Sequence, residues 1–381
     1  PRSTLFPYTT LFRSPEVVKV FPHDSLLEQA WQDRNTLAII PFEDIEPRWK
    51  VVKIDSVSPL QREFNPDDYL LSASYDLSMN SLAEQRLGSD LMATAADFKL
   101  PAINRDPEQL TILVMTGVTA LARATAWKMD TLGVDYPAND IQDWLRDADI
   151  THISNEVSFA EDCPKGDPGQ VSLRFCSRPE YIELLEYVGA DVIELTGNHN
   201  LDWGPGPALN SLDMYQKLGM QVFGGGANLS QAQIPAIVED HGNRLAFIGC
   251  NAAGPQPAWA TDETPGALKC DMDWMRQKVS DLREQGFLPI VTFQYPESYD
   301  PQPLPAQQED FQSMAAAGAV IVSGSQAHRP QGMTFVGQSF VHYGLGNLFF
   351  DQMHVIINDQ EMPGTRDEFI DRHFFYQGRY I

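Results

Sequence analysis

Four short polar segments of the sequence carry side chains that could bind a metal ion or move a proton. In the first, Asn198 and His199 directly follow a run of mostly apolar residues. An asparagine oxygen could ligate a hard or borderline divalent cation, and the adjacent imidazole could protonate a leaving group. Gly197 would let the backbone turn sharply here. The same residues could instead form an Asn/Gly turn beside a surface histidine.

The second and third segments add a carboxylate and another histidine. Glu156 follows the run 150–153 and could bind a metal ion or act as a base, or it could cap the next element. Gln326 and His328 stand two residues apart, so they could point the same way along an extended chain. A lone histidine is more often structural than functional, so a structural role stays open for His328.

The fourth segment is 294–299, which follows the apolar run 288–293. Gln294 and Glu297 could face a site, whereas Tyr295 and Tyr299 could be packing aromatics. No single segment is decisive. All four follow apolar runs, however, and this shared position indicates one common site if those runs are neighbouring strands.

From residue 110 onward, strand-like runs alternate with helix-like stretches. The runs predict strands at 111–115, 150–154, 191–196, 245–249, 288–293 and 320–323, then a hairpin at 333–343 with Gly337 at its turn. This alternation predicts a layered α/β fold. Because ligands bind at the carboxyl ends of strands in open α/β sheets, the four polar segments should meet there.

Helices are expected between these strands. Two are predicted at 120–131 and 139–147, and a third at 177–188, where Ser177 and Glu180 fit a capping box and Gly189 ends the helix. Three later helices should end at glycines, namely Gly219, Gly286 and Gly318.

The chain before residue 111 has a different character. Residues 1–14 resemble translated sequencing-adaptor sequence and are excluded from fold reasoning. Residues 15–97 predict a small, truncated α/β domain with strands at 37–42 and 49–54, and residues 98–110 form a linker to the domain 111–381. Both ends of the sequence are expected to be truncated.

Composition excludes some classes of function. The formal net charge of −25 would repel the phosphate backbone, so a general nucleic-acid-binding role is excluded. No apolar run reaches the ~18 residues that span a bilayer. The four cysteines form no CxxC pair, which argues against a zinc knuckle. Cys163 and Cys176 could form a local disulfide in an exported protein, or remain as buried thiols.

Several motifs together carry a resemblance to a known family. They include Gly197-Asn198-His199 with Asp202, Gly224-Gly225-Gly226 with Asn228, and Leu345-Gly346-Asn347-Leu348-Phe349. On these residues the chain resembles the CapA-like family of poly-gamma-glutamate capsule biosynthesis proteins, from about residue 111 onward. The family is similar to calcineurin-like metallophosphoesterases, so the resemblance implies a layered metallophosphoesterase sandwich.

Three positions depart from the metal-binding pattern of that family. Val118 stands where the family has a ligand Asp, Gln294 replaces a ligand histidine, and Gln326 lies where the family has histidines. The remaining ligand candidates are Glu156, Asn198, His199 and His328. A two-metal centre needs bridging ligands between its ions. We therefore expect one divalent ion (Mn, Zn or Fe) or none.

The resemblance implies a protein of poly-gamma-glutamate synthesis or export, located outside the cell or at its membrane and working with membrane-bound capsule-synthesis partners. Its substrate would be an anionic polymer or a small molecule. If the site is catalytic, the resemblance assigns the chemistry to His199, Glu156 and His328. The expected substrate-binding residues are Arg123, Asn155, Gln294, Glu297, Gln326 and Asn347. The alternatives are a divergent metal-dependent phosphoesterase and a non-catalytic module that binds a polyanion or peptide.

Overall fold

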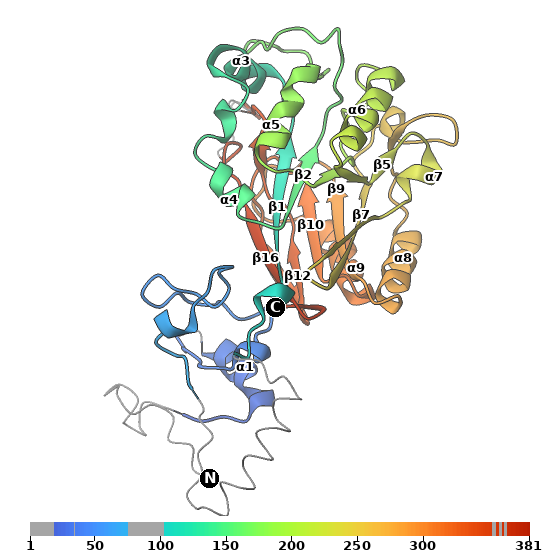
Figure 1. The fold of residues 1–381 in the computed structure, drawn as a ribbon. Helices are drawn as coiled ribbons and strands as arrows, with labels where there is room; N and C mark the ends of the chain where they lie inside the picture. The colour runs from blue at the N-terminus through green and yellow to red at the C-terminus, as the bar shows by residue number, and fades with distance from the viewer. Residues whose placement is uncertain (1–18, 34, 75–102, 353–355, 358–359, 362–363) are drawn as a thin grey trace, which may run out of the picture. The chain divides into compact units, whose positions relative to one another are not determined.

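The computed structural model describes residues 19–33, 35–74, 103–352, 356–357, 360–361 and 364–381 (Figure 1). The chain divides into two compact units: residues 1–59 with 69–105, and residues 60–68 with 106–381. The adaptor-like residues 1–14 and residues 75–102, which include part of the predicted linker, lie outside the described part of the chain.

The smaller unit contains helix α1 (His23–Gln32) and a 3-10 turn at Phe42–Asp44. The strands predicted at 37–42 and 49–54 are wrong. Leu37 is 74% exposed, and Ile54 pairs only with Val57 in one isolated bridge. A strand needs a hydrogen-bonded neighbour, and the described residues of this unit supply none for either segment.

The first sheet of the larger unit is built around β1 (Leu110–Thr119), all of whose residues are buried. On one edge, parallel strands follow in the order β2 (Ile150–Asn155), β3 (Val192–Glu194) and β4 (Gln221–Phe223). The other edge pairs in parallel with β13 (Asn347–Phe349) and antiparallel with β16 (Asp371–Tyr376), which pairs with β17 (Arg379–Tyr380).

The second sheet has four parallel inner strands, β12 (Ser339–His342), β10 (Ile321–Ser325), β9 (Leu288–Gln294) and β7 (Asn243–Asn251). Antiparallel strands flank them, β11 (Met333–Val336) beside β12 and β6 (Ala236–Asp240) beside β7. Two short pairs complete the described strands, β5 (Gly225–Gly226) with β8 (Gly266–Ala267) and β14 (Ile356–Ile357) with β15 (Gln360–Glu361).

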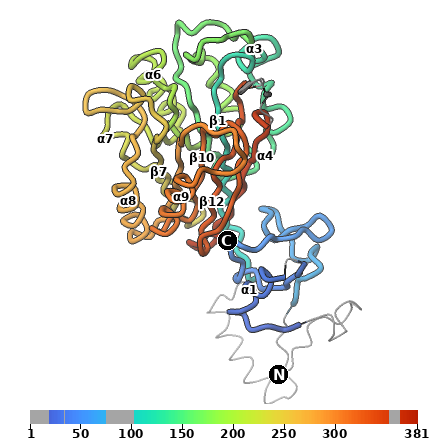
Figure 2. The backbone as a smooth tube through the Cα atoms, turned by 180° about the vertical axis from the view of Figure 1, so that it is seen from behind, coloured from blue at the N-terminus to red at the C-terminus, as the bar shows by residue number. Residues whose placement is uncertain are grey.

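The two sheets pack face to face, with helices outside them. One buried cluster joins side chains of both sheets, including Leu113, Phe223, Phe247, Ile290 and Phe375. The first sheet is covered by α3 (Arg123–Leu132), α4 (Gln142–Arg146), α5 (Ile182–Tyr187) and α6 (Pro205–Lys217). The second is covered by α8 (Met272–Glu284) and α9 (Pro305–Ala317), with short α7 (Leu229–Ala232) beside them (Figures 1 and 2). The predicted layered α/β sandwich is confirmed.

Most helix ends follow the sequence pattern, with one correction. Gly189, Gly219, Gly286 and Gly318 all have positive φ just after helices, as predicted. The capping box predicted at Ser177 and Glu180 is wrong. The Ser177 hydroxyl donates to the Leu121 carbonyl instead, and a 3-10 turn beginning at Pro179 leads into α5. Proline fits this first position because it lacks the N–H that capping would satisfy.

The four cysteines form two disulfides, Cys163–Cys176 and Cys250–Cys270. The first is the bridge that the sequence left open. Within the described residues, no helix has both the length and the apolar composition needed to cross a bilayer.

The buried histidine of β16 predicts a pH dependence of stability. Burial lowers the pKa of His373 from 6.5 to about 4. Below pH 6.5 the His373 imidazole of the unfolded chain therefore binds a proton, whereas that of the folded chain stays neutral. The free energy of unfolding should fall as the pH drops from 6.5 toward 4. The slope should be about 1 kcal/mol per pH unit. His373→Phe should flatten it in chemical denaturation, whereas His23→Phe, at an exposed site, should not. Equal slopes for the wild type and His373→Phe would contradict this account.

Candidate functional site

The polar segments predicted to share one site do follow parallel strands. Glu156 comes after β2, Asn198 and His199 come after β3, Gln294 ends β9, and Gln326 and His328 come just after β10. The first two strands belong to one sheet and the last two to the other. The candidate site therefore lies where the carboxyl ends of both sheets meet.

The side-chain amide of Gln294 links the ends of four strands. Its Nε2 donates to Glu156 Oε1 and to Asn198 Oδ1, at 3.1 Å each. Its Oε1 accepts a hydrogen bond of 2.6 Å from Ser325 Oγ at the end of β10. The other oxygen of Glu156, Oε2, is buried and has no hydrogen-bond partner among the described residues.

Gly197 allows the segments after β2 and β3 to come together. A Cβ atom on Gly197 would lie 2.5 Å from Glu156 Cα and 2.9 Å from Glu156 Cγ. The Glu156 N–H is fixed by a 2.8 Å hydrogen bond to Thr119 O at the end of β1, so the backbone cannot easily retreat. Glycine is therefore needed at position 197 for the close approach of two chain segments, and not for a left-handed turn, because its φ lies outside that region.

His199 is held in a charged environment. Its Nδ1 lies 2.7 Å from Asp202 Oδ2, which also accepts a 2.8 Å hydrogen bond from the Phe175 N–H. Burial lowers the pKa of His199, but the hydrogen bond to Asp202 and the charges of Glu156, Asp202 and Glu297 outweigh it. The net result is a raised pKa, which favours the imidazolium form.

Two phenylalanine rings connect the two histidines of the site. Phe175 meets His199 edge-on, with ring centroids 4.7 Å apart, and lies 5.9 Å from Phe350. Phe350 in turn lies 5.3 Å from His328. The site thus combines titratable groups with an apolar wall, a composition typical of small-molecule and polymer sites.

The loop after β10 is strained. Gln326 and His328 have φ values of +76° and +53°, which side chains other than glycine rarely adopt. Asn347 holds this loop, because its Oδ1 lies 2.9 Å from His328 Nδ1 and its Nδ2 donates to the His328 carbonyl. Gln326 Oε1 is buried without a hydrogen-bond partner in the described residues. Strain of this kind is often kept at functional loops.

The remaining predicted residues differ in their placement. Asn155 is fully buried, and its amide donates to Val157 O and to Tyr215 Oη on α6. It therefore faces the core, and the substrate-binding role predicted for it lacks support. Glu297 accepts a hydrogen bond from Tyr299, and its charge reaches His199. Arg123 begins α3, with its Nε 3.9 Å from Asp351 Oδ2.

The sequence reasoning missed several residues of the site. Asp202 was named as part of the family motif but was given no role in the site, although its spacing of three residues from His199, which a turn can close, was an available signal. Ser325 and the two phenylalanines carried no comparable signal. Their contacts depend on how distant segments fold together.

A sequence model of the family described as bacterial capsule synthesis protein PGA_cap matches residues 112–352. The chain belongs to this family. The matched range contains every candidate residue named above.

Two curated relatives carry names that fit the PGA_cap family. The chain is 25% identical to the capsule biosynthesis protein CapA of Bacillus anthracis over 257 residues, which cover 66% of this chain and 62% of that protein. It is 23% identical to the PGA biosynthesis protein CapA of Bacillus subtilis (strain 168), over 53% of this chain and 52% of that protein. The chain thus matches less than two thirds of either relative.

Among solved structures, the chain is similar to a 5'-nucleotidase precursor from Thermus thermophilus, with 15% identity and a TM-score of 0.39 over 70% of this chain and 54% of that one. It is also similar to the NAD nucleotidase NadN of Haemophilus influenzae, with 10% identity and a TM-score of 0.41 over 72% and 54%. Because both TM-scores are this low, the description of the fold rests on the sheet order given above and not on these similarities.

The donor set of this PGA_cap member does not fit a two-metal centre. Val118 is an apolar, fully buried residue at the end of β1, and Gln294 directs an N–H donor between the oxygens of Glu156 and Asn198. A cation needs acceptors on all sides, so this donor occupies the place that it would need. Among the described residues, no three carboxylate, imidazole or thiol ligands converge at this edge.

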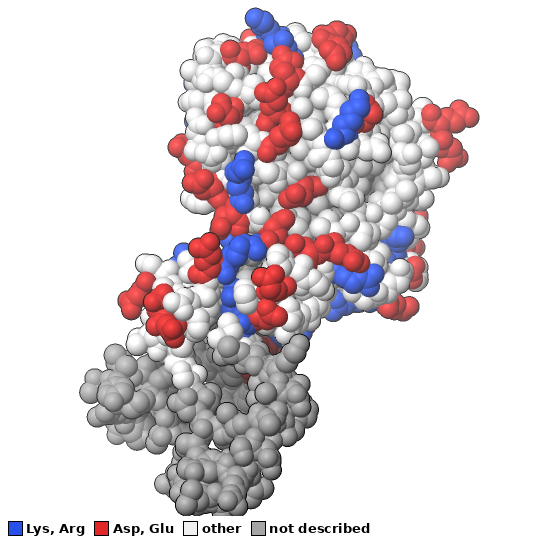
Figure 3. All heavy atoms as spheres, in the orientation of Figure 1, with Lys and Arg blue, Asp and Glu red and all other residues white. Residues whose placement is uncertain are grey.

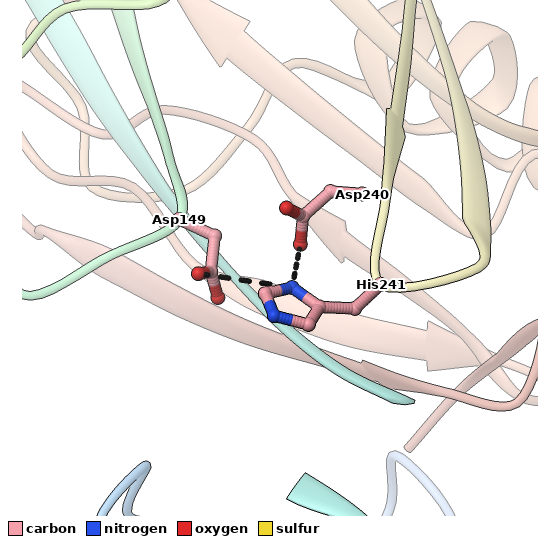
Figure 4. Close-up of side chains that lie close together, drawn as sticks. All are labelled: Asp149, Asp240 and His241. Atoms are coloured by element: carbon pink, nitrogen blue, oxygen red, sulfur yellow. Dashed lines mark hydrogen bonds and ion pairs between the residues drawn. The ribbon is translucent and has the colours of Figure 1, made fainter. Parts of the chain in front are cut away.

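A second charged group lies at the opposite ends of the strands. Asp149 precedes β2, Asp240 ends β6 and His241 follows it, and one ligand atom from each lies within 4.8 Å of the others (Figure 4). His241 Nδ1 is 2.6 Å from Asp240 Oδ2, and Arg62 pairs with Asp149. Thr111 Oγ1 also donates to Asp240 Oδ2, at 2.7 Å. Arg62 and His241 already pair with the carboxylates of Asp149 and Asp240. The group is therefore an ion-pair cluster rather than a preformed metal site.

Replacing the Gln294 amide by a carboxylate tests whether this amide prevents the site from binding a cation. Gln294→Glu puts a carboxylate against Glu156 and Asn198, and we expect it to reduce stability by about 1–3 kcal/mol. Added Mn²⁺ should restore the stability of Gln294→Glu, because the new oxygens complete a cation site, and should leave the wild type unchanged. Thermal denaturation with and without Mn²⁺ measures both effects, and Gln216→Glu on the exposed face of α6 is the control. A wild type that is itself stabilised by Mn²⁺ would contradict the assignment of Gln294 as a substitute for the cation.

Proposed function

We propose that this protein binds poly-gamma-glutamate during capsule synthesis or export, through a metal-independent site centred on His199. The observation that carries the proposal is the Asp202–His199 pair next to Glu156. A protonated imidazole, partly buried and adjacent to an aromatic ring, binds a carboxylate by a charge-assisted hydrogen bond. Membership in the capsule synthesis family supports an anionic polymer as the ligand.

The same groups could carry out hydrolysis or transfer. The imidazolium can donate a proton to a leaving amide nitrogen, and Glu156, with one buried oxygen free of hydrogen bonds among the described residues, can accept one from an attacking nucleophile. The Gln294 network favours a second candidate, a non-catalytic binding module, because it is already hydrogen-bonded without any cation. It argues against a metal-dependent phosphoesterase.

We place this activity outside the cell or at its membrane. Two disulfides and the absence of free cysteines support an oxidising compartment, since thiols stay reduced in the cytosol. Membrane-bound proteins of capsule synthesis are the partners that this location implies. Figure 3 shows acidic side chains spread over the face of the larger unit that is drawn, with some basic side chains among them. Such a surface would repel a polyanion except where cations gather.

The first test measures binding in the presence of EDTA. Titration calorimetry with γ-linked glutamate oligomers should show binding by the wild type, and His199→Ala should weaken it by roughly tenfold. His23→Ala, which removes an exposed histidine of the smaller unit, is the matched control. Mass spectrometry of the same samples distinguishes cleavage from binding alone. Binding that requires added metal, or no binding at all, would falsify the proposal.

Binding should also depend on pH. Affinity is present while His199 is protonated and is lost as the pH rises through its pKa, which lies above the ordinary 6.5. Asp202→Asn removes the negative charge that helps to raise this pKa and leaves at most a neutral hydrogen-bond acceptor, so the loss of affinity should move to lower pH. Anisotropy titrations across the pH range measure the shift. An identical profile for Asp202→Asn would show that another group controls binding.

A further inference from the structure

A cavity of about 390 Å³ opens beside the candidate site, between α3 and the segment 163–176. In Figure 1 this segment is part of the long connection between β2 and α5, which runs past the end of α3. The cavity lining includes three cationic side chains, Arg123, Lys165 and Arg174. Of these, only Arg123 had been predicted to contact a ligand.

The walls of the cavity are fixed in place. Cys163–Cys176 closes the segment at its base and limits the conformations that this loop can adopt. Gly166 lies directly against α3, since a Cβ there would be 2.1 Å from the Trp127 nitrogen. A preformed cavity of this kind binds a ligand without first having to order a loop.

The cations of the cavity are poorly neutralised. Within the described residues, no ion pair involves Lys165 or Arg174, and both residues are exposed. Among the described residues, Arg123 approaches a carboxylate at Asp351, at 3.9 Å, and its Nε is buried without a hydrogen-bond acceptor. Asp167 is the one carboxylate in the lining. In a chain of net charge −25, such a group of cations marks a place where an anion is attracted.

Aromatic surface completes the lining. Tyr181 and Trp203 both border the cavity, and the Arg174 guanidinium lies over the Trp203 ring, 5.2 Å from its centroid. Aromatic faces accommodate methylene groups, while the cations accommodate carboxylates. A γ-linked glutamate chain offers both, because each unit carries one free carboxylate and two side-chain methylenes in its backbone.

Hydrogen bonds connect this cavity to His199. Arg174 Nη2 donates to the Asp202 carbonyl at 2.6 Å, and the next residue, Phe175, donates its N–H to the Asp202 carboxylate. That carboxylate holds His199. Arg174 lines the cavity and is linked through Asp202 to His199, so the two regions adjoin and can hold neighbouring parts of one chain.

We propose that the cavity between α3 and the segment 163–176 is a subsite for the free carboxylates of a γ-linked glutamate chain, placed so that the adjoining unit reaches His199. This inference rests on the proposed function. It assigns Lys165 and Arg174 to polymer binding and gives Arg123 a defined location within the binding surface.

Charge-removing variants of the full chain test the subsite. Fluorescence anisotropy with a labelled γ-glutamate oligomer should show that Lys165→Gln and Arg123→Gln each weaken binding by roughly fivefold. Lys217→Gln removes the same charge from exposed α6, outside the cavity, and should bind like the wild type. Gly166→Ala keeps every charge but forces the segment away from α3, so it should also weaken binding. Unfolding midpoints show whether each variant is folded.

The outcomes separate the two proposals. Wild-type binding that Lys165→Gln, Arg123→Gln and Gly166→Ala all leave unchanged overturns the subsite, and the function centred on His199 stands. Equal weakening by Lys217→Gln also overturns it, because the effect would then be one of net charge. A wild type that does not bind the oligomer overturns the proposed function and the subsite together.

Discussion

One primary amide joins the two sheets at the edge where their parallel strands end. Gln294 lies on the second sheet, yet its Nε2 bonds to Glu156 and Asn198, which follow strands of the first. A buried donor between two acceptors needs no counter-ion, whereas two oxygens facing each other would. The geometry of the candidate site therefore depends on hydrogen bonds made by a neutral amide, which changes what chemistry the site can support. Proton transfer and anion binding remain open to it, whereas activation of water by a pair of metal ions does not.

The presence of an amide donor in place of a cation at this edge affects the electrostatics of the protein. A chain with net charge −25 would repel a polyanionic ligand over most of its surface. Without metal ions, attraction must come from side chains, and the structure gathers cationic groups close to one another. His199 is one, because the acids around it raise its pKa despite its burial. Arg123, Lys165 and Arg174 are the others, in the adjoining cavity. The acidic residues beside His199 thus help to maintain the positive charge to which we assign ligand binding in our proposal.

How much the sequence could predict depended on whether the signal was local. Apolar runs and terminal glycines located the central strands and several helices of the larger unit, because burial and positive φ are properties of short segments. They did not locate the edge strands β4 and β6. The convergence of Glu156, Asn198 and Gln294 also followed, since parallel strands align their ends. Ser177 was misassigned because its hydroxyl bonds to Leu121, far away in sequence. The strands predicted at 37–42 and 49–54 do not form, because no described segment of the smaller unit lies beside them as a hydrogen-bonded partner strand. The cavity could not be predicted, because it depends on the contact of Gly166 with α3, which joins segments that only folding brings together. The Cys163–Cys176 bridge at its base was a local possibility that the sequence had left open.

The pairing of β1 with β16 has a consequence for biogenesis. The first strand of the larger unit finds its antiparallel neighbour in a strand that is synthesised long after it, once both sheets have otherwise been made. Until then one edge of a fully buried strand stays unpaired, which invites aggregation or chaperone binding. A partly synthesised chain therefore cannot complete its first sheet. Such a delay is compatible with translocation, which requires a chain that has not yet folded.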